Sequence, residues 1–222
     1  MKTRLIVILL FSTLSIFNVW GQNIESFVKG GVTFGLFDGT AASNEDVGHT
    51  GLNIGGGVRL PVNKSRTTFL EPALELISKG NVYDIKSGGR VSFSLWYLEA
   101  QLDFVYHWQI GKHWNIPIGT GLYGAYGIGS KISTTNCITW FRGIPVGESP
   151  SMFANVVGAN RWDAGWRVWT VGVEYDRFMF RWDFEAGFFS QFHNRMPYEF
   201  EEGRKKYRGS NWAMSLNVGY CF

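Results

Sequence analysis

The stretch NWAMSLNVGYCF, residues 211–222, alternates large apolar side chains with small or polar ones along its whole length. The apolar positions are Trp212, Met214, Leu216, Val218, Tyr220 and Phe222. Successive side chains of a β-strand point to opposite faces, so this period of two predicts a strand with one apolar face. The apolar row reaches the last residue of the sequence, whereas the ends of soluble domains are usually polar and frayed. We therefore expect this strand to be held within a sheet.

Seven earlier segments alternate in the same way, which brings the expected number of strands to eight. They span residues 27–37, 50–60, 67–79, 92–108, 114–129, 165–175 and 178–192. All are longer than the about 5–6 residues typical of soluble strands, and they match the roughly 9–11 residues that cross a membrane. Pro72 lies inside the third segment and predicts a bulge, because proline cannot donate to a strand ladder. The last strand is expected to pair with the first and so to remove both edges of the sheet.

The connections between these segments alternate in length. Short connections at 61–66, 110–113 and 176–177 separate longer ones at 38–49, 80–91, 130–164 and 193–209. An even number of strands with short turns at one end and long loops at the other is typical of outer-membrane barrels. The expected fold class is therefore all-β, an eight-stranded antiparallel transmembrane up-and-down β-barrel. Its termini would lie on the periplasmic side and its long loops outside the cell.

The first 21 residues have the layout of a secretory signal peptide. Lys2 and Arg4 precede an apolar run at 5–17, which is shorter than the roughly 20 residues of a membrane-spanning helix. We expect cleavage after Gly21, which leaves residues 22–222 as one barrel domain. Of the 21 Lys and Arg residues, 19 then remain against 18 Asp and Glu, a net charge of +1. So small a charge gives no reason to expect a nucleic-acid partner.

Alternation alone leaves open which face of the barrel is outside. A secreted lipocalin-type barrel would turn its apolar face inward around a ligand, whereas an outer-membrane barrel turns it toward lipid. The apolar face carries aromatic residues near the strand ends, as an aromatic girdle requires, among them Trp96, Trp108, Trp182 and Tyr220. The opposite face combines acidic residues with many of the 28 glycines, which suits the crowded interior of an eight-stranded barrel. We therefore expect the polar face to line the lumen.

The expected lumen carries charges of both signs, and these must be paired. A buried unpaired charge costs several kcal/mol, so we expect a hydrogen-bonded network that stiffens the barrel. Its members, together with Lys79, are Lys29, Arg59, Glu71, Glu75, Glu99, Asp103, Glu174, Arg181, Asp183 and Glu185. The acids outnumber the bases, so a proton or cation path through a narrow porin-like channel is the alternative interpretation.

Three segments carry a resemblance to a known class of proteins. The stretches FLEPALELISKG (69–80), WYLEAQLDFVY (96–106) and WAMSLNVGYCF (212–222) are similar to strands of small outer-membrane barrels of the OmpX and OmpA-barrel type. The whole of residues 22–222 resembles the PorT-like outer membrane protein beta-barrel family. The resemblance implies insertion by the outer-membrane assembly machinery, with the terminal strand as the recognition signal. It implies no defined substrate, because the matching segments are architectural.

Two histidine groups are candidates for chemistry, and neither forms a complete site. His107 and His113 flank a short turn at the expected periplasmic mouth; with no third ligand, we interpret them as solvated and expect no metal. Ser190, His193 and the following glutamates resemble the set found in lipid A deacylases, but FHNRM at 192–196 lacks the serine of the His-x-Ser-Asn pattern. We therefore expect no catalytic residue, no cofactor and no enzymatic activity, with a lipid A-modifying enzyme as a further alternative.

The long connection at 130–164 is the least barrel-like segment and the candidate for interaction. It holds aromatic and arginine residues of the kind that anchor interfaces, namely Trp140, Phe141, Arg142, Phe153 and Trp162. The alternative is a loop that packs on itself over the barrel mouth. Cys137 and Cys221 are expected at opposite rims and therefore unbonded. The expected partners are outer-membrane lipid, lipopolysaccharide and an envelope protein, and the expected role is structural, adhesive or accessory to an envelope complex.

Overall fold

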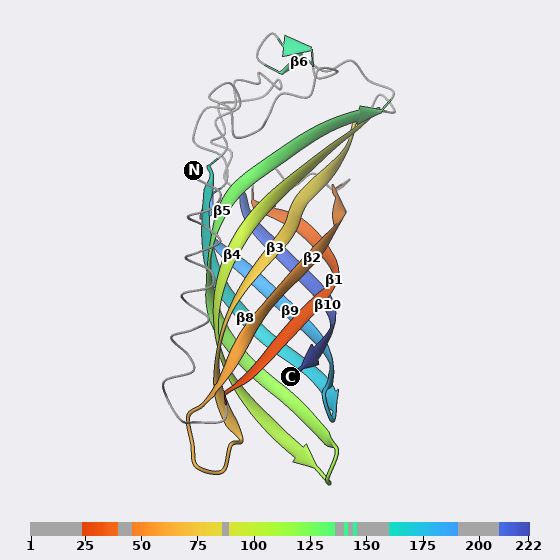
Figure 1. Ribbon diagram of the computed structural model, residues 1–222. Coiled ribbons are helices and arrows are strands. Elements are labelled where there is room, and N and C mark those ends of the chain that lie inside the picture. Colours follow the sequence, from red (N-terminus) through yellow and green to blue (C-terminus); the bar gives the residue numbers. More distant parts are fainter. Residues whose placement is uncertain are drawn as a thin grey trace, which may run out of the picture.

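Eight long strands make up the body of the protein. The computed structural model describes residues 24–39, 46–85, 89–135, 140–141, 144–145, 160–190 and 209–222, and the expected signal peptide lies outside these ranges. The strands are β1 (Glu25–Gly39), β2 (Asp46–Pro61), β3 (Thr68–Ile85), β4 (Gly89–Ile110), β5 (Trp114–Thr135), β8 (Trp162–Tyr175), β9 (Phe178–Ser190) and β10 (Gly209–Cys221). They close into one barrel of antiparallel pairs in the order β1-β10-β9-β8-β5-β4-β3-β2 (Figure 1). The expected eight-stranded antiparallel barrel is confirmed.

Two further strands are only two residues long and pair with each other. β6 (Trp140–Phe141) and β7 (Ile144–Pro145) lie in the connection between β5 and β8, and β6 is at the upper end of Figure 1. In the part of the chain that the structure describes, no helix has the length and apolar character needed to cross a membrane.

β10 closes the barrel by pairing with β1 along its length. The register runs from Phe27 opposite Cys221 to Gly39 opposite Gly209. Both strands then have hydrogen-bonded neighbours on both sides, because β10 also pairs with β9 and β1 with β2. A closed ladder of this kind leaves no exposed sheet edge. The expected pairing of the terminal strand with the first strand is confirmed.

Three short turns lie at one end of the barrel, the lower end in Figure 1. They occupy residues 62–67, 111–113 and 176–177. Left-handed backbone at Arg66, Gly111 and Asp176 lets the chain reverse within so few residues. Asn63 holds the longest turn by accepting two backbone N–H groups, at 3.0 and 3.2 Å. This end is called the turn end below, and the opposite one the loop end.

β3 and β4 extend further toward the loop end than the sequence pattern predicts. They leave only residues 86–88 between them, so most of the expected loop at 80–91 is a paired hairpin. In this region the polarity of the two faces is exchanged. Phe93 and Leu95 are buried on the inner face, and Ser94 lies on the outer face. The pattern of outward-facing apolar residues therefore ends before β3 and β4 do.

The expected bulge at Pro72 is wrong. The register between β3 and β4 runs through Pro72 without a shift. On the other side, β2 pairs with residues before and after Pro72 in one register, and the pairing lapses at Pro72 itself. The lapse accommodates the missing N–H donor without an inserted residue. Register shifts occur elsewhere, one of them between Arg167 and Trp169.

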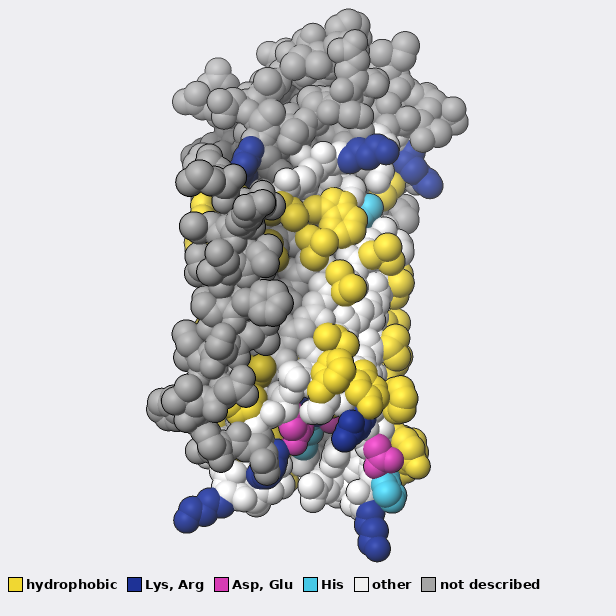
Figure 2. Space-filling model, in the orientation of Figure 1, with side chains coloured by type: hydrophobic (Ala, Val, Ile, Leu, Met, Phe, Trp, Pro, Cys, Tyr) yellow, Lys and Arg dark blue, Asp and Glu magenta, His cyan; other side chains and the backbone are white. Residues whose placement is uncertain are grey.

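The apolar face of the sheet is the outer face of the barrel. On β4, Leu98, Phe104 and Trp108 are 49%, 51% and 57% exposed, whereas Glu99 and Asp103 between them are buried. In Figure 2, hydrophobic side chains lie along the described barrel wall, and the coloured charged side chains lie toward its two ends. The barrel therefore has its polar face in the lumen, the reverse of the lipocalin-type arrangement.

A side chain at Gly31 is expected to oppose closure of the barrel. A Cβ atom there would collide with the backbone carbonyl of Leu216 and lie 2.9 Å from Oδ1 of Asn217, both on β10. Gly31→Ala should lower the free energy of unfolding by about 1–3 kcal/mol or more. The measurement is the thermal midpoint in detergent together with heat-modifiable migration on gels.

Gly124→Ala is the matched control, because no atom lies within 4 Å of a Cβ at that position. It should change stability by less than about 0.5 kcal/mol. Equal stability of the two variants would contradict the tight seam between β1 and β10.

Candidate functional site

The polar interior of the barrel is the candidate site. The structure buries all eleven side chains that the sequence placed there, none more than 5% exposed: Lys29, Arg59, Glu71, Glu75, Lys79, Glu99, Asp103, Glu174, Arg181, Asp183 and Glu185. Further buried members are Asn53, Gln101, His107, Asp163, Arg167, Thr170, Asn211 and Asn217. Within the described residues, eight buried carboxylates thus face five buried lysines and arginines.

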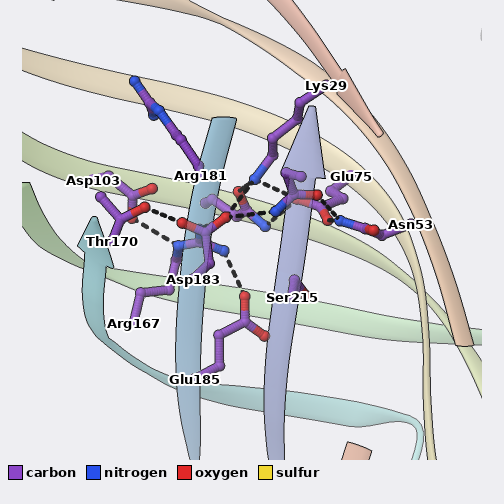
Figure 3. A network of polar contacts seen from close by, with 12 residues as sticks. Lys29, Asn53, Glu75, Asp103, Arg167, Thr170, Arg181, Asp183, Glu185 and Ser215 are labelled. Atoms are coloured by element: carbon purple, nitrogen blue, oxygen red, sulfur yellow. Dashed lines mark hydrogen bonds and ion pairs between the residues drawn. The ribbon is translucent and has the colours of Figure 1, made fainter. Parts of the chain in front are cut away.

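Asp183 is the centre of the network (Figure 3). Its Oδ2 atom lies 3.3 Å from Nζ of Lys29 and 3.0 Å from Nη2 of Arg167. The hydroxyl of Thr170 donates to Oδ1, and Nδ2 of Asn217 donates to Oδ2 at 2.9 Å. The carboxylate on β9 is therefore held by side chains from β1, β8 and β10 at once.

Arg167 is the buried cation that sequence reasoning missed. Its guanidinium lies 2.9 Å from Asp103, 3.0 Å from Asp183 and 2.5 Å from Glu185. The register shift between Arg167 and Trp169 reverses the phase of β8, so alternation counted back from the end of the strand places Arg167 outside. The signal in the sequence is the change of the tryptophans from even to odd positions along β8.

Lys79 joins two carboxylates on opposite walls of the barrel. Its Nζ atom lies 2.6 Å from Oε2 of Glu99 and 2.8 Å from Oε2 of Glu185. The ammonium also sits 4.1 Å from the ring centre of Tyr123, which adds a cation–π contact. Tyr123 in turn donates from its hydroxyl to Asp163 at 3.3 Å.

A second cluster lies nearer the turn end. Arg181 donates to Glu71 at 2.5 Å and to Glu174 at 2.9 Å. Nε of Arg59 lies 3.0 Å from Glu71, and Nη2 of Arg59 donates to Glu174. Two guanidinium groups and two carboxylates therefore form a closed set, which meets the need to pair buried charges.

The expected solvated pair of histidines is wrong for His107. It is buried inside the barrel, with Nδ1 3.3 Å from Glu174 and Nε2 3.4 Å from Glu71, and its ring packs edge-on against Phe69. His113 is solvated but does not reach the lumen: it lies in a turn and contacts Asp176 at 2.7 Å. Within the described ranges, no three His, Cys, Asp or Glu side chains are placed to hold a metal ion.

Amide side chains donate hydrogen bonds to the carboxylates that outnumber the buried lysines and arginines. Nε2 of Gln101 donates to both Glu75 and Glu99, at 2.7 and 2.8 Å. Asn53 also donates to Glu75, and Asn211 donates to Asp163 at 2.8 Å. These amides let carboxylates approach one another without a cation for each, because every donated hydrogen bond replaces part of the lost hydration.

Several of these bonds cross the full width of the barrel. The pair Arg59–Glu174 joins β2 to β8, and the pairs Arg181–Glu71 and Lys79–Glu185 join β9 to β3. In the closed strand order, β2 lies opposite β8 and β3 lies opposite β9. Side chains that meet across the diameter occupy the lumen, so the middle of the barrel is filled and held rigid.

A vestibule of about 530 Å³ enters the barrel from the turn end. Its walls include Glu25, Arg59, Arg66, Phe69, His107, Glu174 and Cys221. Since Arg59, His107 and Glu174 belong to the second cluster, the vestibule stops at that cluster. Cys221 on its wall is a buried free thiol, and Cys137 lies outside the described residues.

The residues of the expected interaction loop are only partly described. Trp140 and Phe141 form β6, of which the backbone alone is described, and Arg142 and Phe153 lie outside the described residues. Ser190 ends β9, and His193 and the glutamates after it lie outside the described residues. Trp162 is not in a loop: it begins β8 and is 65% exposed on the outer face.

Comparison with known proteins yields likenesses in solved structures alone. No protein-family model matches the chain, and no curated protein matches it. Neisserial surface protein A (NspA) is similar with a TM-score of 0.47 at 10% identity, over 89% of this chain and 97% of that one. Ail of Yersinia pestis, solved with the heparin analogue sucrose octasulfate, gives 0.43 at 13%, over 90% and 100%. OprG from Pseudomonas aeruginosa gives 0.44 at 10%, over 89% and 95%. The fold therefore rests on the strand order and register described above, and the PorT-like resemblance stays a resemblance.

Loss of Arg167 is expected to destabilise the barrel strongly. Arg167→Gln leaves Asp103, Asp183 and Glu185 facing one another without their shared cation. Breaking a buried ion pair by removing one partner costs about 3–5 kcal/mol. Equilibrium unfolding in urea with phospholipid vesicles measures the change.

Arg66→Gln provides the control, because the Arg66–Glu25 pair has a similar distance, 2.7 Å, but side chains that are 37% and 38% exposed. It should cost no more than about 1 kcal/mol. Equal effects of the two substitutions would show that the lumen network contributes no more than a surface pair.

Proposed function

We propose that the protein is an integral outer-membrane barrel with a closed lumen and no enzymatic activity, which acts through its loop end as a structural, adhesive or accessory component of the envelope. The observation that carries the proposal is the exchange of faces: charged side chains fill the inside, and large apolar side chains cover the outside. That arrangement suits a lipid environment and is costly in water.

The outer surface is apolar on every long strand. Exposed side chains include Val28 on β1, Ile54 on β2, Leu74 on β3, Leu102 on β4, Leu122 on β5, Val173 on β8, Phe180 on β9 and Val218 on β10, between 42% and 65% exposed. Soluble monomers rarely expose a contiguous apolar patch larger than a few hundred Å². A belt that surrounds the whole barrel therefore supports a membrane location.

Polar groups within this belt bond to one another. The indole N–H of Trp166 donates to the hydroxyl of Thr120 at 2.6 Å, and that hydroxyl donates to the backbone carbonyl of Arg167 at 2.8 Å. The carbonyl belongs to the register shift in β8, where the ladder is interrupted. Lipid offers no hydrogen bonds, so this chain of donors is the kind of satisfaction that a lipid-facing bulge requires.

Aromatic pairs mark both edges of the belt. The ring centres of Trp114 and Tyr175 lie 4.8 Å apart at the turn end, and those of Tyr126 and Trp162 lie 4.9 Å apart toward the loop end. Tyr126 follows Trp114 by twelve positions on β5, a distance of about 40 Å along the strand. With a strand tilt of about 40° from the barrel axis, the two aromatic pairs are about 30 Å apart along that axis. This height matches a hydrocarbon core of about 25–30 Å.

The two ends of the barrel support one direction of insertion. Outer-membrane barrels have short turns on the periplasmic side and longer loops on the outside. The short turns 62–67, 111–113 and 176–177 therefore support a periplasmic turn end, with the connection that holds β6 and β7 outside. Insertion by the outer-membrane assembly machinery through β10 is part of the same proposal.

A positive charge in the belt is expected to destabilise the protein. Leu122 is 58% exposed near the middle of the belt, and Leu122→Arg should lower the free energy of unfolding in lipid by about 2–4 kcal/mol. Val62→Arg is the matched control, because Val62 is equally exposed but lies in a turn outside the belt. A neutral Leu122→Arg would indicate that water and not lipid surrounds the belt.

Planar bilayer recordings test the closed lumen against the channel alternative. That alternative is favoured by the vestibule at the turn end, which stops at Arg59 and His107. The native protein should show no steady conductance, because ion pairs join opposite strands across the lumen. Arg59→Ala with Arg181→Ala should increase brief openings. A stable conductance of the native protein would favour the channel.

A further inference from the structure

Arg161 sits beside two aromatic side chains at the edge of the apolar belt. Its Nη1 atom donates to the hydroxyl of Tyr126 at 3.5 Å. The rings of Tyr126 and Trp162 meet edge to face, with centres 4.9 Å apart and planes at 65°. Tyr126 is 37% and Trp162 65% exposed, and Arg161 is exposed as well. A cation and two amphipathic rings therefore share one patch of the outer wall.

The backbone fixes the position of this patch. Tyr126 and Trp162 are the last pair in the register between β5 and β8. The carbonyl of Arg161 accepts the N–H of Gly127 at 2.7 Å, and the side chain of Asn160 accepts the N–H of Trp162 at 3.1 Å. Arg161 is thus held at the start of a barrel strand, and sites on such rigid elements keep their geometry better than sites on loops.

Among the described residues, the exposed charged side chains near the patch are basic. At the loop end, the exposed charged side chains that the structure describes are Arg90, Lys131 and Arg161. At the turn end the exposed charges are of both signs, since Asp176 accompanies Lys112 and other bases. In the view of Figure 2, the charged side chains coloured at the upper end are basic, and acidic ones are seen at the lower end. These described bases favour an anionic ligand over a cationic one beside Tyr126 and Trp162.

Height and chemistry together indicate what kind of anion fits. Arginine binds phosphate through two parallel N–H donors, which a lysine cannot do. Tyrosine and tryptophan at the edge of an apolar belt lie at the level of lipid headgroups. A lipid phosphate bound at Arg161 would therefore lie at headgroup depth. The acyl chains of that lipid would run along the belt, and its sugar would lie over the exposed indole of Trp162.

We propose that Arg161, with Tyr126 and Trp162, binds the phosphorylated sugar headgroup of a glycolipid in the leaflet at the loop end. The proposal rests on the membrane location proposed above. Lys131 and Arg90, further out on the same end, add a general attraction without setting the position of the phosphate.

The test uses the full chain reconstituted into phosphatidylcholine vesicles, with diphosphorylated lipid A as the probe. Binding is followed by tryptophan fluorescence and by native mass spectrometry after extraction. Arg161→Gln should weaken binding by about tenfold or more, since it removes a charge-assisted hydrogen-bond donor pair. Arg161→Lys should recover only part of the affinity. Lys112→Gln, which removes one positive charge from the turn end, should bind like the native protein.

Three results would overturn the headgroup site. These are equal affinity of the Arg161→Gln and Lys112→Gln variants, equal binding of lipid A whose phosphates have been removed, and displacement of lipid A by millimolar inorganic phosphate, which would indicate an anion site without lipid selectivity. Failure of the native protein to enter vesicles would instead overturn the membrane location. Insertion of all variants with undiminished binding by Arg161→Gln would leave that location intact and remove only the site.

Discussion

The pairing of charges across the lumen is the interaction on which the rest of the structure depends. Once the large apolar side chains point outward, an eight-stranded barrel has an interior just wide enough for side chains, and these must satisfy one another. Arg167, Arg181 and Lys79 do so by reaching carboxylates on several strands. Removing one partner leaves an uncompensated buried charge, so the network fixes the register of opposite walls as well as filling the space between them.

The sequence predicts the barrel well because its strongest signals are local. β4 and β10 alternate with a period of two, and that pattern gives the strands, the faces and the closing pair. The pattern fails in two places. The register shift after Arg167 turns that residue inward. In the part of β4 before Trp96 the described apolar side chains face inward, so the pattern does not reveal the extended hairpin of β3 and β4. The sequence also does not predict which charges pair, because contacts such as Arg59–Glu174 depend on which strands lie opposite each other after the barrel closes. The sequence does not predict the burial of His107, because its two acidic partners come from other strands.

A filled lumen leaves the outer surface and the two ends as the accessible parts of the described barrel. The turn end offers a vestibule that stops at Arg59 and His107, and the loop end offers an exposed arginine that donates to Tyr126 next to the Tyr126–Trp162 ring pair. These features are linked through β8, which carries Arg167 inside, Trp166 toward the belt and Trp162 at its edge. The register shift in this strand allows one short segment to serve both the network and the apolar outer wall.

The exchange of faces is tested most directly by a spin-label scan of β4 in vesicles. Single nitroxides are placed from Tyr97 to Trp108 in a background without the two native cysteines. Labels at even positions, such as Leu98 and Phe104, should collide with lipid-dissolved oxygen and resist polar reagents; labels at odd positions, such as Glu99, should be shielded from oxygen. Alternation of the opposite phase, or equal access of a polar reagent to both sets, would contradict an apolar outer wall around a paired polar core.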